Sequence, residues 1–403
     1  MGNFSIATMK NIKIIITIAI IIVTLIIIGF IAKQVFQSVV KDITQGEIKR
    51  ITGEKTAEIT QQEIDRITKG VIQQGTSGLK SEVKKCDLTP TVRKYKVESY
   101  YTGQWIDSHV HMPVSSKIVS SVAVQSGFLD MPAFDEELSI DYIVCLFNSE
   151  GISKTIGFFL APSPVFSSSI NTVKNIEKQY PGKIAAFYMP TPLASINPKP
   201  DEVEKILQEN LGLFKGLGEI KFAYYEIPND KPEDPQYLEL YSIANRNKLV
   251  IMMHPAVDHK DEVERLLQKY PDAIFFLHGE SEEWVFDLMD NYSNLYYQIG
   301  HELYTFGINP EHNQRALTKA EWEEYAKPKF NDILESEFKK WKPLIDKYPD
   351  RLTLGTDRWY SWHFDQDVGA FMEEFERSFL GKFDQSVQEK LAYKNAEKLI
   401  TNK

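Results

Sequence analysis

Five side chains of types that bind metal ions stand at or next to the ends of short apolar runs. His109 and His111 close WIDSHVH, His254 follows VIMM, His278 follows IFFL and Asp357 follows LTLGT. Two histidines two positions apart on a β-strand face the same side, so both imidazoles can reach one ion. Each histidine alone fits an ordinary core position. A buried aspartate, however, needs a cation or hydrogen-bond donors, and the five together predict a shared divalent-metal site.

A further pair of chemically active residues lies in the run GLGEIKF. Glu219 and Lys221 are two positions apart, so on a strand they share one face. Glu219 could add a carboxylate to the metal site, and Lys221 could serve there or contact substrate. The alternative is an ordinary ion pair inside the fold.

The residues after Asp357 are candidates for substrate binding. Arg358 can pair with a carboxylate or phosphate. The aromatic side chains that come next, Trp359, Tyr360 and Trp362, offer apolar surface, although surface packing would explain them equally well. We expect the histidines in loops or after the seventh strand, His259, His301 and His312, to be ordinary residues, with His301 as the first candidate for an exception.

These residues belong to a regular alternation of strand and helix patterns. Eight runs are predicted as strands: Trp105–His109, Tyr142–Phe147, Ile184–Met189, Gly218–Phe222, Leu249–His254, Ala273–His278, Asn294–Ile299 and Arg351–Asp357. Between several of them, apolar residues recur at the i, i+3, i+4 spacing of a helix with one buried face, as in Val263, Leu266 and Leu267. Tyr-Pro recurs where three helices give way to strands, at 180–181, 270–271 and 348–349, because proline cannot continue a helix.

Eight strands that alternate with helices over some 300 residues predict an α/β fold, a (β/α)₈ TIM barrel. A doubly wound sheet is the alternative. The barrel is favoured because the ligand-type residues all fall at carboxyl ends of strands, which form the active-site face of a TIM barrel.

The chain before the barrel has a different character. Residues 14–32, IIITIAIIIVTLIIIGFIA, carry no charge and as a helix would be about 28 Å long, enough to cross a bilayer. We predict a transmembrane anchor over 1–33, a helical stalk or linker over 34–95 and the catalytic domain over 96–403. The alternative to the anchor is a cleaved signal peptide. The alternative to the stalk is a helix that lies on the barrel. The stalk would allow a homo-oligomer.

The charge of the chain bears on its binding partners and on its orientation in a membrane. The net charge of −10 gives no overall basic surface for nucleic acid. Lysines before the span are balanced by lysines and an arginine after it, so the positive-inside rule does not decide its orientation. We expect the barrel on the extracytoplasmic side, since N-terminal anchors commonly export the domain that they precede.

The only cysteines, Cys86 and Cys145, lie in different regions of the sequence, so we expect no disulfide framework. We expect Cys145 to be an unpaired thiol in the core, and Cys86 could cross-link two stalks.

Residues 100–403 resemble the amidohydrolase superfamily. The resemblance rests on WIDSHVH, on His254 and His278 ending the predicted fifth and sixth strands, and on Asp357 within LGTDR. The closing segment YKNAEKL is similar to that of the amidohydrolase-related branch, also called amidohydrolase 2. The resemblance implies His109, His111, His254, His278 and Asp357 as metal ligands.

The resemblance also implies roles for these ligands. Asp357 would bind metal and move a proton, and His278 would bind a second ion or stabilise an oxyanion. In relatives with two ions, a fourth-strand carboxylate such as Glu219, or a carbamylated lysine, bridges them. Zinc is the first expectation for one or two ions, because imidazole and carboxylate ligands suit it, and manganese is the alternative for a site with more oxygen ligands.

The function expected from these residues is hydrolysis of a C–O or C–N bond in a small-molecule lactone, ester or amide by a metal-activated water. A metal-dependent, non-oxidative decarboxylase of a small carboxylic acid is the first alternative. An inactive barrel kept as a binding module is the second.

Overall fold

The computed structural model describes residues 85–112 except 91 and 96, and residues 138–160, 166–189, 200–222, 231–301 and 318–401. The predicted membrane span, 14–32, and most of the predicted stalk, 34–95, lie outside this part and stay predictions. In the described part, no helix is both long enough and apolar enough to cross a membrane.

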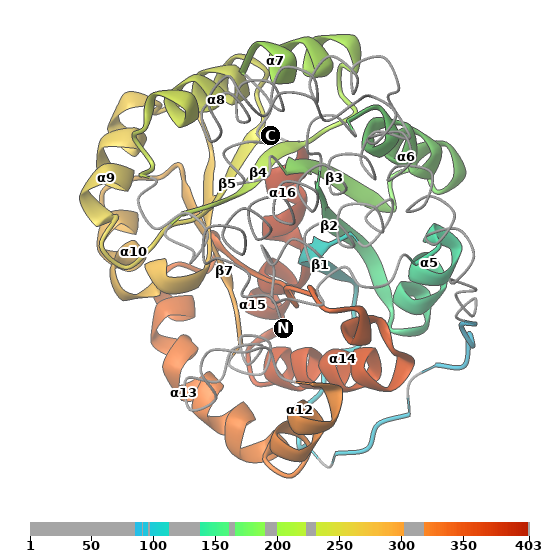
Figure 1. The fold of residues 1–403 in the computed structure, drawn as a ribbon. Coiled ribbons are helices and arrows are strands. Elements are labelled where there is room, and N and C mark those ends of the chain that lie inside the picture. The colour runs from blue at the N-terminus through green and yellow to red at the C-terminus, as the bar shows by residue number, and fades with distance from the viewer. Residues whose placement is uncertain are drawn as a thin grey trace, which may run out of the picture. The chain divides into compact units, whose positions relative to one another are not determined.

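Eight parallel strands form one sheet in the order of the sequence (Figure 1). They are β1 (Trp105–His111), β2 (Ile152–Leu160), β3 (Ile184–Met189), β4 (Gly216–Lys221), β5 (Val250–His254), β6 (Phe275–Leu277), β7 (Leu295–Ile299) and β8 (Leu352–Leu354). Each strand pairs with the next one along the chain.

The last strand also reaches the first. The backbone N–H of His111 donates to the carbonyl of Arg358 at 3.0 Å, and the Ser108 hydroxyl donates to the carbonyl of Leu354 at 2.7 Å. The sheet is thereby a nearly closed barrel, which confirms the predicted fold class for this part of the chain.

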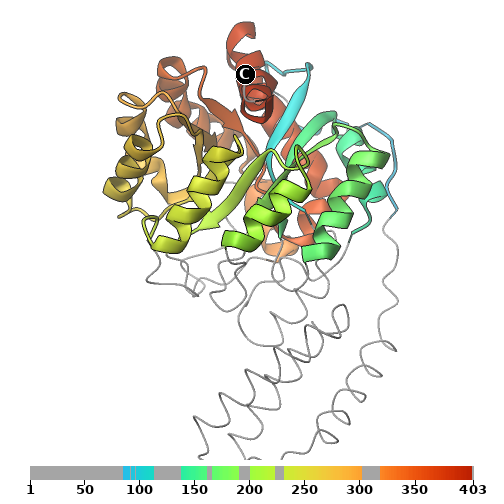
Figure 2. The same ribbon diagram turned by 90° about the horizontal axis from the view of Figure 1, so that it is seen from above.

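Most of the helices lie around the outside of the strands, whereas α15 and α16 lie across the middle of the barrel in the view of Figure 1 (Figures 1 and 2). They are α5 (Ile140–Ser149), α6 (Phe166–Gln179), α7 (Pro200–Glu209), α8 (Pro235–Arg246), α9 (Lys260–Lys269), α10 (Glu282–Met289), α12 (Lys319–Ala326), α13 (Phe330–Lys347), α14 (Gln366–Gly381), α15 (Gln385–Glu389) and α16 (Asn395–Thr401). Short turns of 3₁₀ or π helix are η3 (Gly279–Ser281), η5 (Ser361–Phe364) and η6 (Lys390–Lys394). The predicted Tyr-Pro phrases directly follow α6, α9 and α13.

Successive side chains along a strand point alternately into the barrel interior and outward to the layer beneath the helices. On β5, Val250 and Met252 belong to an interior cluster with Phe276 of β6, whereas Ile251 and Met253 pack in the outer core. His254 comes two positions after Met252 and therefore faces the interior as well. Two residues of α16, Leu399 and Ile400, complete the interior cluster.

The predicted second strand is wrong. Residues 142–147 lie in helix α5, whose N-terminus is capped by the Ser139 hydroxyl accepting from the N–H of Tyr142 at 3.2 Å. The strand at this place is β2, which starts after Gly151 at a φ of 69°. An apolar run of six residues fits a buried strand or a helix face equally well, and here the cap and the packing of Ile143 and Leu146 decide for the helix.

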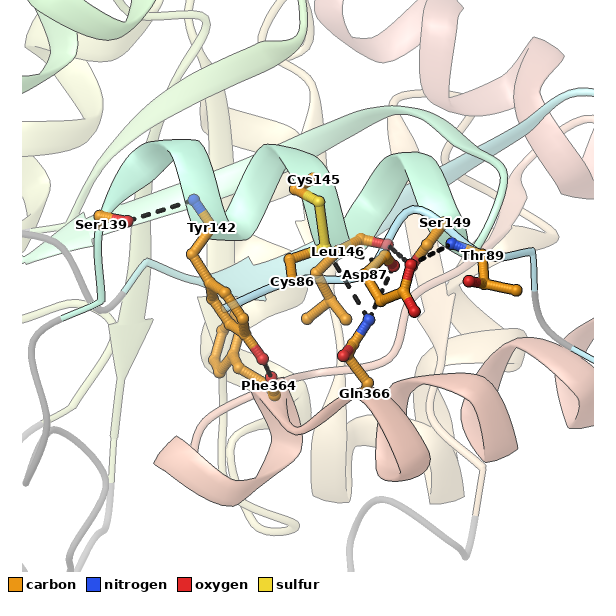
Figure 3. The surroundings of a disulfide bond; sticks show 10 residues. All are labelled: Cys86, Asp87, Thr89, Ser139, Tyr142, Cys145, Leu146, Ser149, Phe364 and Gln366. Carbon is orange, nitrogen blue, oxygen red and sulfur yellow. Dashed lines mark hydrogen bonds between the residues drawn. A yellow bond between two sulfur atoms is a disulfide. The ribbon is translucent and has the colours of Figure 1, made fainter. Parts of the chain in front are cut away.

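The two cysteines form one disulfide within the chain, which corrects both expectations about them. Cys86 lies in the irregular segment before β1 and Cys145 lies on α5, with Cα atoms 6.0 Å apart (Figure 3). Beside the bond, the Gln366 amide of α14 donates to the carbonyl of Asp87 at 2.8 Å. The segment that leads into the barrel is thus fastened to two helices.

The same segment is held by a buried carboxylate further along α14. Glu374 accepts the backbone N–H of Lys94 at 2.9 Å and that of Tyr95 at 2.7 Å. The Tyr95 ring stacks on Phe330 with centroids 3.9 Å apart. The end of the predicted stalk is therefore part of the packed barrel unit.

We expect Cys145→Ser to lower the free energy of unfolding by about 2–4 kcal/mol, because the bond restricts the unfolded chain across a separation of 59 residues. Denaturant unfolding with and without reductant measures the loss. A Cys86→Ser/Cys145→Ser double variant is the control and should match the single variant, since either change removes the same bond. Two titratable thiols in the oxidised wild-type protein would contradict the pairing.

Candidate metal centre

The carboxyl ends of β1, β4, β5 and β6 and the residue three positions beyond β8 bring the predicted ligands together inside the barrel. His109 and His111 are fully buried, and their Nε2 atoms lie 3.2 Å apart. This confirms that the two histidines share one face of β1. The β1–β2 register shifts between Asp107 and Val110, around His109, and such irregularities re-aim side chains next to functional sites.

Glu219 lies at the centre of this group and is fully buried. Its Oε1 is 3.0 Å from His254 Nδ1 and 2.8 Å from His278 Nε2. Its Oε2 faces the other way, 3.4 Å from His111 Nε2 and 3.9 Å from His109 Nε2. The two oxygens of one carboxylate therefore face two different pairs of histidines.

Asp357 completes the side of the group nearest β1. Its Oδ1 is 3.2 Å from His111 Nε2 and 3.4 Å from His109 Nε2. The residue has a φ of 47°, a left-handed conformation that Asp and Asn adopt more readily than most residues. Asp107 supports this turn by accepting from the hydroxyl of Thr356 at 2.6 Å and from its N–H at 2.9 Å.

The ligand atoms fall into two overlapping groups, each within 4.8 Å: His109, Glu219 and His278, and His109, His111 and Asp357. Among the described residues, Glu219 Oε2 and Asp357 Oδ1 are buried and have no hydrogen-bond partner. Buried carboxylate oxygens that form no hydrogen bond are costly, even where an ammonium such as that of Lys221 lies 3.3 Å from Glu219 Oε2. Converging imidazole nitrogens and carboxylate oxygens are the ligands of zinc and similar ions, so the arrangement fits a divalent metal.

The electrostatics favour the forms that bind metal. Burial lowers the pKa of His111 to about 4, so it is neutral at physiological pH. Burial alone would raise the pKa of Glu219, but Lys221 and the hydrogen bonds with His254 and His278 hold it well below its usual value. Burial likewise opposes ionisation of Asp357, and the neighbouring histidines outweigh it and lower its pKa. A neutral His111 beside ionised Glu219 and Asp357 gives these three residues the protonation states that coordination requires.

Lys221 lies at the edge of the group. Its Nζ is 3.3 Å from Glu219 Oε2 and 4.1 Å from the centre of the Trp359 ring. Trp359 in turn contacts His111 edge to face, with ring centres 4.1 Å apart. The predicted Glu219–Lys221 ion pair is present, but Glu219 also contacts all four histidines, so the ion pair does not explain its position by itself.

Arg358 is not placed as predicted. Its guanidinium is fully buried and forms two bonds with Glu150 at the end of α5, at 2.6 and 3.2 Å. A fully buried, bidentate ion pair is a structural contact between α5 and the chain after β8, so the expected role of Arg358 in binding substrate is not supported. His301 is also outside the cluster: its two ring nitrogens face Glu337 and Glu376, at 2.9 and 3.4 Å.

Sequence reasoning missed Gln298 of β7 and Gly279. Gln298 Oε1 is 2.9 Å from His109 Nδ1, and the side chain is fully buried. In the sequence, a glutamine within the apolar and aromatic run LYYQI was the feature that could have indicated a buried polar contact. Gly279 follows His278 with a φ of 78°, and a Cβ there would lie 2.1 Å from His254 Nε2. Only glycine leaves room for the His254 ring.

We expect Gly279→Ala to displace His254 and to lower the metal content of the centre, because the methyl group would occupy the place of the imidazole. Metal content per chain, measured by elemental analysis, should fall while the other ligands keep their places. Gly182→Ala is the matched control: Gly182 has a φ of 69° and nothing within 4 Å of the added Cβ. It should cause similar backbone strain and leave metal content unchanged. Equal metal content in both variants would contradict the steric argument.

No protein-family model matches this sequence, and no curated protein matches it. Solved structures are similar in fold. One is a provisionally named 2-pyrone-4,6-dicarboxylic acid hydrolase from Pseudomonas putida, with 14% identity, 74% of this chain and 97% of that chain covered, and a TM-score of 0.50. Two others are an uncharacterised TIM-barrel protein from Bordetella bronchiseptica (17% identity, 74% and 98% covered, TM-score 0.47) and a zinc-bound amidohydrolase from Burkholderia multivorans (12%, 74% and 99%, 0.49). At these identities the similarity concerns the barrel fold.

Proposed function

We propose that this protein is a metal-dependent hydrolase of the amidohydrolase type that acts on a C–O or C–N bond of a small lactone, ester or amide. The observation that carries the proposal is the position of Glu219, whose two oxygens face His109 and His111 on one side and His254 and His278 on the other. A carboxylate in this position suits a bridge between two ions. The barrel fold and the hydrolase name of the Pseudomonas putida protein agree with it.

The ligand set divides between two ions on this proposal. His109, His111 and Asp357 would hold the first, His254 and His278 the second, and Glu219 would touch both. Zinc is the proposed metal, since neutral imidazole and carboxylate ligands suit it. Divalent ions held here would lower the pKa of a water molecule toward about 7 and polarise a carbonyl.

The chain's own residues supply the proton transfer and the positioning. Asp357 is ionised and its side chain is 22% exposed, so it can take a proton from water and return it to the leaving group. His278 stays neutral because burial lowers its pKa. Lys221 and Trp359, at the edge of the cluster, are placed to contact substrate.

Hydrolysis is proposed ahead of decarboxylation because Glu219 offers the ligand for a second ion. Elemental analysis of the purified protein, with a screen of lactones, esters and amides before and after chelation, tests the choice. Two ions per chain and hydrolysis that chelator removes would support the proposal. One ion with decarboxylation of a small carboxylic acid would favour the alternative, and a protein without metal would favour a binding module.

We also propose that residues 14–32 anchor the chain in a membrane, with the barrel on the extracytoplasmic side. The disulfide between Cys86 and Cys145 supports this side, because disulfides persist mainly in oxidising compartments. Protease added to intact cells that express the chain should degrade the barrel. Protection of the barrel until the cells are opened would reverse the orientation.

A further inference from the structure

Gln298 lies behind the metal centre rather than in it. It is the fourth residue of β7, its side chain is fully buried, and its Oε1 is 2.9 Å from His109 Nδ1. His109 Nε2, on the opposite side of the ring, faces the ligand cluster, and His109 belongs to both groups of ligand atoms. A contact that fixes this imidazole therefore acts on the residue that the two groups share.

The orientation of the Gln298 amide is determined by its own partners. Its Nε2 donates to the carbonyl of Ile299 at 2.7 Å and to that of Gly355 at 2.9 Å. Both amide hydrogens are thus used on carbonyl oxygens, which cannot donate. The carbonyl Oε1 is left to face His109, and since it can only accept, His109 must carry its proton on Nδ1.

This fixes what the other ring nitrogen can do. A neutral histidine protonated at Nδ1 presents an unprotonated Nε2, the form that coordinates a metal ion. His111 has no such support: its Nδ1 is buried and has no hydrogen-bond partner in the described part of the chain. The bond from Gln298 to Gly355 also ties β7 to the residue two positions before Asp357.

We propose that Gln298 is a positioning residue that selects the metal-binding tautomer of His109 and holds the carboxyl ends of β1 and β8 together at the centre. The inference rests on the proposed function in that the site binds a divalent ion. Hydrogen-bond partners behind metal ligands typically contribute about 10–100-fold to metal affinity. Gln298 should contribute in this range although it touches no ion.

The test is Co²⁺ binding to the full-length chain, by chelator competition and by the visible absorption of the bound ion. Gln298→Met keeps the volume and removes the acceptor and both donors, so Co²⁺ affinity should fall about 10–100-fold and the absorption bands should shift. Thr353→Val is the matched control: it removes a buried hydroxyl that bonds Ser108 between β8 and β1 at 2.9 Å and that lies outside both groups of ligand atoms. Its affinity and spectrum should equal those of the wild type.

Gln298→Glu is a second variant in case the methionine protein does not fold. It keeps an acceptor for Nδ1–H and loses the donors, so its affinity should fall less than that of Gln298→Met and its spectrum should stay closer to the wild type. Two results would overturn the positioning role alone. The first is wild-type affinity and a wild-type spectrum in Gln298→Met. The second applies if Gln298→Met is unfolded: wild-type affinity and a wild-type spectrum in both Gln298→Glu and Thr353→Val. A wild-type protein that binds neither Co²⁺ nor Zn²⁺ would overturn the proposed function, and the inference with it.

Discussion

Glu219→Gln should reduce the metal content of the proposed two-ion centre to at most one ion and lower the proposed hydrolysis by about 100-fold or more. An amide has one oxygen that can bind metal, so it cannot serve the two histidine pairs that the carboxylate oxygens face at 2.8–3.0 Å and 3.4–3.9 Å. Partners that merely support a ligand already contribute about 10–100-fold, and a shared ligand should contribute at least the upper end of that range. Elemental analysis and turnover of a substrate found by screening measure both effects.

The matched control for Glu219→Gln is Glu337→Gln. Glu337 of α13 is also a buried carboxylate bound to a histidine, His301, at 2.9 Å, but it lies outside the metal cluster. This variant should lose stability without losing metal. If Glu219→Gln retained two ions per chain, Glu219 would not be the bridge and the two-ion centre would be wrong.

Asp357→Asn should lower turnover by about 10²–10⁴-fold while leaving much of the metal in place. Asparagine keeps an oxygen toward the ion but cannot accept the proton that a carboxylate takes from water, and general acid–base groups typically contribute this much. The backbone should tolerate the change, because asparagine adopts the left-handed conformation found here at a φ of 47° about as readily as aspartate. The kinetic constants and the metal content of the same sample decide the matter.

Two observations distinguish a loss of proton transfer from a loss of metal binding or of folding stability. Added metal should not restore Asp357→Asn, since the ion is not what the variant lacks. Asp107→Asn, a change of the same kind at the buried carboxylate that supports Thr356, should disturb stability and positioning more than proton transfer. Near-normal turnover in Asp357→Asn would show that another group moves the proton.

Local patterns in the sequence were sufficient to predict seven of the eight strands and to place the candidate ligand residues at or near their ends. On β5, the alternation of Val250 and Met252 with Ile251 and Met253 already places His254 toward the interior. The spacing of His109 and His111 likewise fixes their common face, whatever the rest of the fold. These features follow from the two-residue period of a strand, which a chain carries in its own order of residues.

The predicted strand at 142–147 failed for a related reason. A run of six apolar residues contains no period that separates a buried strand from the buried face of a helix. The choice was made by the cap at Ser139 and by the packing of α5 against the barrel. The next strand, β2, could be assigned only once that helix was in place.

Tertiary structure alone decided which side chains meet across the barrel. Arg358 follows Asp357 in sequence, yet it is bound to Glu150, and Cys86 finds Cys145 across 59 positions. Gln298 reaches His109 only because β7, β8 and β1 are brought together where the barrel closes. The sequence determined the chemical type of each residue and the periodic pattern of apolar and polar residues that sets which side chains are buried. The contacts between residues far apart in the chain depend on the register and closure of the whole sheet.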